Sequence, residues 1–99
     1  MNGKLLAFVD IYVESQQMQD VIDSLLKLED LEMLYEVTGE FDLTIMISAS
    51  DIEELRDILK NKIINVGGIK STVTSIVLKT HKGPRCQENK PIPAADASL

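Results

Sequence analysis

The chain is poor in the residue types that covalent cross-linking, metal binding and catalysis most often use. Its 99 residues include one cysteine, Cys86, one histidine, His81, and no tryptophan. A single cysteine excludes an internal disulfide, and His81 with Cys86 cannot supply a zinc ligand set. A Ser-His-Asp triad would have to use the one histidine. We therefore expect no catalytic residue, no metal and no cofactor, and we expect both side chains to be solvated.

Long apolar runs and an excess of positive charge are also missing. No apolar run approaches the roughly 20 residues of a membrane-spanning helix, so no membrane partner is expected. The net charge is −6 and the pI is about 4.6. Binding to a phosphate backbone needs clustered Lys and Arg, so the charge argues against direct DNA binding. The lone thiol fits a reducing compartment, and we expect a cytoplasmic protein.

What the sequence does contain is a regular alternation of strand and helix patterns. Strands are expected over about 4–14, 31–38, 41–48 and 69–79, because apolar residues alternate there or β-branched residues accumulate. Amphipathic helices are expected after the first and third strands, one capped by Ser15 and one opened by a capping box at Ser50-Asp51-Ile52-Glu53. This order predicts an α+β, ferredoxin-like βαββαβ sandwich, in which two helices cover one face of an antiparallel four-stranded sheet.

The composition changes after His81. Gly83-Pro84 interrupts the pattern, and Pro91 and Pro93 follow. We expect one domain over residues 1–81 and a C-terminal tail without regular structure over residues 82–99.

The strand alternation also predicts which side chains face the helices. Odd positions of the first strand are apolar, and the same parity in the other strands assigns these residues to the helix side: Met33, Tyr35, Val37, Phe41, Leu43, Ile45, Ile47, Ile69, Val73 and Val77. Even positions would face away: Leu6, Phe8, Asp10, Tyr12, Leu34, Thr38, Asp42, Thr44, Met46, Thr72, Thr74, Ile76 and Leu78. So many large apolar groups on an uncovered face predict a homodimer that packs through it.

Polar groups on that second face suggest a binding site. Val37-Thr38-Gly39-Glu40-Phe41-Asp42-Leu43 is a glycine turn between two strands, followed by an aspartate, and Thr72 and Thr74 lie in the last strand. A carboxylate can pair with an ammonium group, while hydroxyls and turn N–H groups can hold a carboxylate. A free amino acid presents both groups. The alternative is structural, since threonine is common in strands and an aspartate beside a turn often caps its own backbone.

The turn resembles the Gly-x-x-Asp turn of the ligand-binding domain of Lrp/AsnC regulators, often called the RAM domain. Ile69 to Leu78 is similar to the closing strand of that family, in which Thr-x-Thr precedes an apolar run. The resemblance covers about the first eighty residues. It implies that Gly39, Asp42, Thr72 and Thr74 match positions that contact effector amino acids at the junction between dimers.

The same resemblance implies homo-oligomers, with dimers assembling into a ring such as an octamer, and a full-length Lrp/AsnC regulator as a further partner. Family members usually carry a helix-turn-helix domain first, whereas here the first strand starts near Lys4. We therefore expect a stand-alone sensing domain and not an enzyme.

The alternative function is a small dimeric α+β barrel enzyme, for example a monooxygenase-like protein of the same topology. Such an enzyme needs an enclosed pocket with a reactive side chain between the sheet and the helices. The sequence instead fills that layer with aliphatic residues, which favours the sensor.

Overall fold

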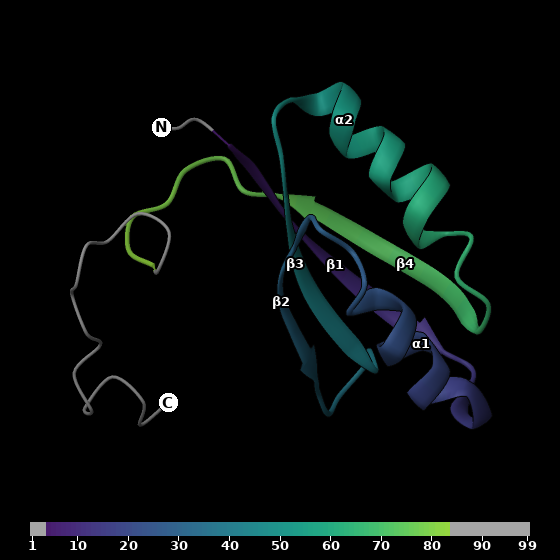
Figure 1. Ribbon diagram of the computed structural model, residues 1–99. Coiled ribbons are helices and arrows are strands. Elements are labelled where there is room, and N and C mark those ends of the chain that lie inside the picture. Colours follow the sequence, from purple (N-terminus) through teal and green to yellow (C-terminus); the bar gives the residue numbers. More distant parts are fainter. Residues whose placement is uncertain (1–3, 84–99) are drawn as a thin grey trace, which may run out of the picture.

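The computed structural model of the chain describes residues 4–83 (Figure 1). The strands are β1 (Leu5–Val13), β2 (Leu31–Glu36), β3 (Leu43–Ala49) and β4 (Ile69–Ile76). The helical segments are η1 (Ser15–Gln17), a 3₁₀ turn, then α1 (Met18–Leu25), α2 (Ile52–Asp57) and its π-helical continuation η2 (Ile58–Ile63). Both the α+β class and the βαββαβ order are confirmed. Cys86 and most of the expected tail lie outside the described residues.

The four strands form one antiparallel sheet with the order β2-β3-β1-β4. Figure 1 shows the two helices on the same side of this sheet, with α1 following β1 and α2 following β3. The strands β1 and β3 are therefore central, and β2 and β4 form the edges. Among residues 4–83, no helix lies on the opposite face of the sheet.

The core lies between the sheet and the helices and is entirely aliphatic. In the central strands the predicted alternation is confirmed, because Val9, Ile11, Ile45 and Ile47 are fully buried and face the helices. They pack with helical side chains that are also buried: Val21, Leu25, Leu55, Ile58 and Ile63. Burying one such side chain contributes roughly 1.5–3 kcal/mol as an upper estimate.

In the edge strand β2 the predicted parity is wrong. The register runs from Leu31 opposite Ile47 to Met33 opposite Met46, so β2 contains one extra residue at this point. Directly paired residues share a face, and one added residue moves all later side chains to the other face. Leu34 therefore packs against the core, while Met33 and Tyr35 lie on the uncovered face.

The same correction applies to β4. Its pairing with β1 shifts from Val13 opposite Ile69 to Tyr12 opposite Ser71, which again leaves one extra residue in the edge strand. Beyond the shift, Thr72 lies opposite Ile11 and Thr74 lies opposite Val9. Both threonines are therefore on the helix side. Ile76 joins them, while Val73 and Val77 are on the uncovered face.

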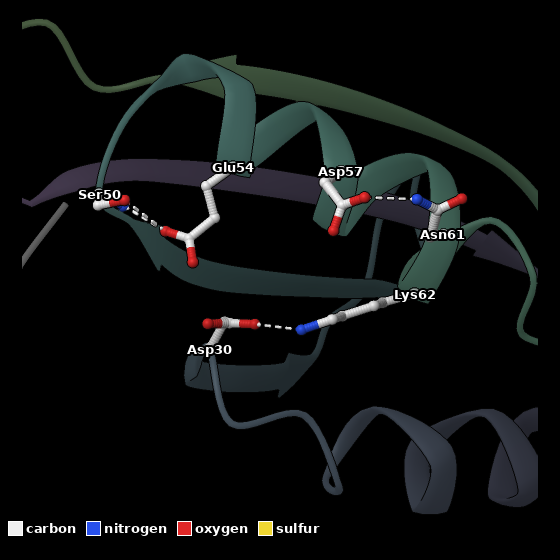
Figure 2. Close-up of polar contacts among 6 residues, drawn as sticks. All are labelled: Asp30, Ser50, Glu54, Asp57, Asn61 and Lys62. Carbon is white, nitrogen blue, oxygen red and sulfur yellow. Dashed lines mark hydrogen bonds and ion pairs between the residues drawn. The ribbon is translucent and has the colours of Figure 1, made fainter.

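The helix starts also differ in detail from the prediction. Ser15 makes no capping hydrogen bond and belongs to η1. The capping box before α2 exists but is shifted by one residue: the Asp51 carboxylate accepts from the Glu54 N–H at 2.8 Å. In return, Glu54 Oε1 accepts from the backbone N–H and the hydroxyl of Ser50 (Figure 2). These hydrogen bonds hold the pKa of Glu54 below its ordinary value.

Charged side chains join the end of η2 to the start of β2. The Lys62 ammonium lies 3.1 Å from Asp30 Oδ2 (Figure 2), and this hydrogen-bonded pair raises the pKa of Lys62. The Ser48 hydroxyl donates to Glu32 Oε2 at 2.7 Å. The acidic residues Asp30 and Glu32 therefore both have side-chain partners in the fold.

The loop before β4 is held tightly against the first helix. Gly68 has a φ of +102°, and its carbonyl accepts from the Glu14 N–H at 2.8 Å. A Cβ at this position would lie 2.8 Å from the Val21 side chain. Glycine is therefore required here for two reasons, backbone conformation and space.

Candidate functional site

The Gly39 turn joins the ends of β2 and β3 through a defined set of backbone hydrogen bonds. Gly39 adopts a φ of +115°, with no atom near the position of a Cβ. The Val37 N–H donates to the Asp42 carbonyl at 3.0 Å, and the Asp42 N–H donates to the Ile11 carbonyl at 3.0 Å. The first hydrogen bond closes the turn, and the second ties it to β1.

The Asp42 carboxylate has a structural partner. Its Oδ2 accepts a hydrogen bond from the Val13 N–H at 2.8 Å, at the last residue of β1. Asp42 therefore caps a strand that lies 29 residues away in sequence, and not its own turn. A partly buried carboxylate with a backbone donor is well satisfied.

The four predicted site residues come to the same end of the sheet but not to the same face. Leu43 and Thr72 both lie opposite Ile11, so the turn and the threonines flank β1 near its end. Thr72 and Thr74 are half-buried on the helix side, which corrects the expectation that they face away. The β4 register shift separates them from the uncovered face.

Three side chains at the Gly39 turn were not assigned to the site from the sequence: Tyr12, Glu40 and Phe41. The rings of Tyr12 and Phe41 have centroids 4.7 Å apart and are tilted by 45°. Desolvation raises the pKa of Tyr12, and the negative charges of Glu40 and Asp42 raise it further. The even parity of Tyr12 and the position of Glu40 inside the turn were the only sequence signals for this cluster.

The uncovered face of the sheet holds a cavity of about 600 Å³. Its apolar walls come from three strands and from the segment after β4: Leu6, Phe8, Met33, Tyr35, Met46 and Val77. Lys79, His81 and Lys82 also line it. His81 is exposed, as expected, and Phe8 and Tyr35 are 40% and 53% exposed. The prediction of an apolar uncovered face is confirmed, although different residues of the edge strands form it.

Other chemistries find little support within residues 4–83. This part of the chain contains no group of three His, Cys, Asp or Glu side chains that could hold a metal ion. None of its helices has the length and apolarity needed to cross a membrane.

Comparison with known proteins gives consistent matches. The family model of the Lrp/AsnC ligand binding domain matches residues 6–85. The HTH-type transcriptional regulator FL11 of Pyrococcus abyssi is 38% identical over 78 residues, which are 79% of this chain and 51% of the relative. The chain spans about half the length of the curated relatives it matches.

Solved structures agree with this result. Escherichia coli AsnC superposes with a TM-score of 0.77 at 26% identity, over 81% of this chain and 54% of that one. A transcriptional regulator from Neisseria meningitidis, solved as a complex with L-Met, gives a TM-score of 0.76 over 80% of this chain and 53% of its own. Its identity of 21% supports a shared fold only.

Proposed function

We propose that this chain, which belongs to the Lrp/AsnC ligand-binding domain family, is an amino-acid-sensing and oligomerisation module that acts on transcription regulators. The observation that carries the proposal is the family match over residues 6–85, which includes the Gly39 turn and the Thr72–Thr74 pair. The relatives are named as transcriptional regulators, and a protein of the same fold was solved with a free amino acid, L-Met.

The proposed effector site consists of Gly39, Asp42, Thr72 and Thr74. The turn would offer backbone N–H groups to the carboxylate of the amino acid, and the threonine hydroxyls would hold it from the helix side. One carboxylate oxygen of Asp42 already accepts from Val13, which leaves the other oxygen for an ammonium group. A second subunit at this end of the sheet would complete the enclosure.

The proposed partner of the uncovered face is a second copy of the chain. Phe8, Tyr35 and Val73 are 40%, 53% and 50% exposed on this face, and burying them would favour association. The polar group near the centre is already paired, because the Thr44 hydroxyl donates to Asp10 Oδ1 at 2.7 Å. Dimers would assemble further into a ring such as an octamer, by analogy with the family.

The proposal places the protein in the cytoplasm, where transcription regulators act, and gives the domain no DNA contact of its own. A net charge of −6 opposes the phosphate backbone. In a mobility-shift assay we expect no shift with the pure domain, and a changed shift when a full-length regulator is added. A shift by the domain alone at moderate salt would contradict this part of the proposal.

The enzyme alternative is not favoured. It needs a reactive side chain in a pocket between sheet and helices, but aliphatic side chains fill this layer.

A thermal-shift screen of the twenty amino acids tests the sensing role. A ligand at a hundred times its Kd should stabilise the folded state by about 2.7 kcal/mol. Calorimetry should then give a reproducible Kd and a fixed number of bound ligands per subunit. If no amino acid binds at millimolar concentration, the sensing proposal fails.

A further inference from the structure

One charged side chain lies near the middle of the uncovered face. Asp10 is close to the centre of β1 and is already half-buried within the single chain. Thr44 lies opposite it in β3, and Val73 lies opposite it in β4. Phe8 and Tyr12 flank it on the same face of β1. A carboxylate therefore lies near the centre of the proposed contact between two copies.

The Asp10 carboxylate has one hydrogen-bond donor. The Thr44 hydroxyl donates to Oδ1 at 2.7 Å, and within residues 4–83 no other hydrogen bond or ion pair reaches this carboxylate. An ionised carboxylate offers about four acceptor positions. In the single chain, water can occupy the others. A second copy that covered the face would remove this water and leave the negative charge with one donor.

No positive side chain compensates this charge. The strands around Asp10 place these titratable groups nearest to it in register: Tyr12 in β1, Tyr35 in β2, Asp42 before β3 and Lys70 at the register shift of β4. Three basic side chains line the cavity on the same face: Lys79, His81 and Lys82. In the part of the chain that the structure describes, none of these groups forms an ion pair with Asp10. Burial would therefore favour the neutral, protonated form of its carboxyl group.

Symmetry would add a second charge to the first. In a dimer with a two-fold axis, both copies use the same surface patch. A residue near the middle of that patch comes close to its own counterpart, whichever direction the axis takes within the contact. The two Asp10 carboxylates would thus approach each other where water is excluded. Like charges in such a place favour the uptake of a proton by one or both groups.

We propose that Asp10 makes the self-association of this chain dependent on pH, because two copies bind each other more tightly when this carboxyl group is protonated. The inference rests on the proposed dimer and specifies how its strength is regulated. The dimer binds more protons than the separated subunits, so association strengthens as the pH falls and weakens as it rises. With one Asp10 in each copy, the dissociation constant changes by at most about a hundredfold per pH unit.

The test measures the dissociation constant of the full chain by sedimentation equilibrium at about pH 5.5 and about pH 8, in about 0.3 M salt to screen the net charge. We expect the wild type to associate about tenfold or more tightly at the lower pH. Asp10→Asn keeps an oxygen acceptor for the Thr44 hydroxyl but carries no charge. It should associate equally well at both pH values, and more tightly than the wild type at the higher one.

Two control variants separate Asp10 from other sources of pH dependence. Asp20→Asn removes the same charge from an exposed position of α1, so it should keep the pH dependence of the wild type. His81→Gln removes the one histidine, which titrates in this range, and should keep it as well. If either control abolished the dependence, it would come from the net charge or from His81, and the role of Asp10 would be overturned.

The remaining outcomes distinguish this inference from the proposed dimer. A wild-type dimer with the same dissociation constant at both pH values would overturn the role of Asp10 and leave the dimer standing. Weaker association of Asp10→Asn at both pH values would overturn it too, because the carboxylate would then pair with a positive group across the contact. If neither the wild type nor Asp10→Asn associates at either pH, the proposed dimer fails and this inference fails with it.

Thr44→Val tests the hydrogen bond in the contact. The ionised Asp10 carboxylate would lose its one donor, so association should weaken by about threefold or more at about pH 8 and by less at about pH 5.5. Melting curves of this variant and of Asp10→Asn check that both remain folded. Equal changes at both pH values would show that Thr44 acts through packing alone, and would overturn its role as the donor.

Discussion

The same strands form both faces of the sheet, but the side chains are buried on one face and partly exposed on the other. On the helix side, Val9, Ile11, Ile45 and Ile47 have no exposed surface. On the other side, Phe8 remains 40% exposed beside a cavity of about 600 Å³. Because β1 and β3 supply both sets, the difference comes from what covers each face. One face is completed by the helices of the chain itself, and we propose that a second copy completes the other.

The largest effect is expected from a truncation on the helix side. Ile45→Ala removes a fully buried side chain from a central strand, so the free energy of unfolding should fall by about 2–5 kcal/mol. Urea denaturation should show this loss at every protein concentration. Phe8→Ala is the matched control on the uncovered face. The loss of unfolding free energy in Phe8→Ala should depend on protein concentration. Equal losses in the two variants at every concentration would contradict the proposed difference between the faces.

The next effect concerns association. Phe8→Glu would place an unpaired charge at the proposed contact, which costs several kcal/mol when such a charge is buried, on the order of 3–5. Light scattering at micromolar concentration should then report a monomer, while Phe8→Leu should remain associated. A stable, folded monomer in the wild type would refute the proposed dimer.

Alanine substitutions at two glycines compare the tightly packed loop at Gly68 with the open turn at Gly39. Gly68→Ala forces both a positive φ and a contact with Val21, so it should cost about 1–3 kcal/mol. Gly39→Ala meets no neighbouring atom and should lie at the lower end of that range. Gly67→Ala, with open space and no positive φ, serves as the near-neutral control. Melting temperatures in the reverse order would argue against the packing of the Gly68 loop.

The register of β4 can be tested with adjacent residues. Thr74→Val puts an apolar side chain opposite the buried Val9, so the stability of the isolated subunit should change by no more than about 1 kcal/mol, in the favourable direction. Val73→Ser should instead weaken association, because Val73 lies on the uncovered face. Unfolding and sedimentation across a concentration series distinguish the two effects. If Thr74→Val changed association and Val73→Ser changed only the stability of the subunit, the side-chain orientation predicted from the sequence would be correct for β4.

The smallest effect belongs to the cap of α2 and depends on pH. The folded-state pKa of Glu54 is lowered by its hydrogen bonds to Ser50. Its contribution to stability is therefore present above the unfolded pKa, near 4.5, and is lost as the pH falls through the lower folded value. Glu54→Gln should flatten the decrease in melting temperature as the pH falls below about 4.5, whereas Glu53→Gln on the same helix should not. Identical profiles for both variants would contradict the capping role.

The sequence alone determined the class of fold and the orientation of the central strands. Apolar residues at every second position of β1 and β3 leave only one face for the core, since a single-residue slip would expose all of them. The glycine turn and the acidic start of α2 were also visible, because they depend on residues close together in the chain.

Only the tertiary structure decided the faces of the edge strands and the surroundings of the turn. One extra residue in β2 and one in β4 reverse the parity beyond them, which moves Thr72 and Thr74 to the helix side. Local sequence does not mark these shifts, because each is defined by the register against a neighbouring strand. The hydrogen bond from Val13 to Asp42 and the contact between Tyr12 and Phe41 likewise join separate segments. Such contacts depend on how β1 and β3 are aligned in space, which alternation along a single strand does not encode.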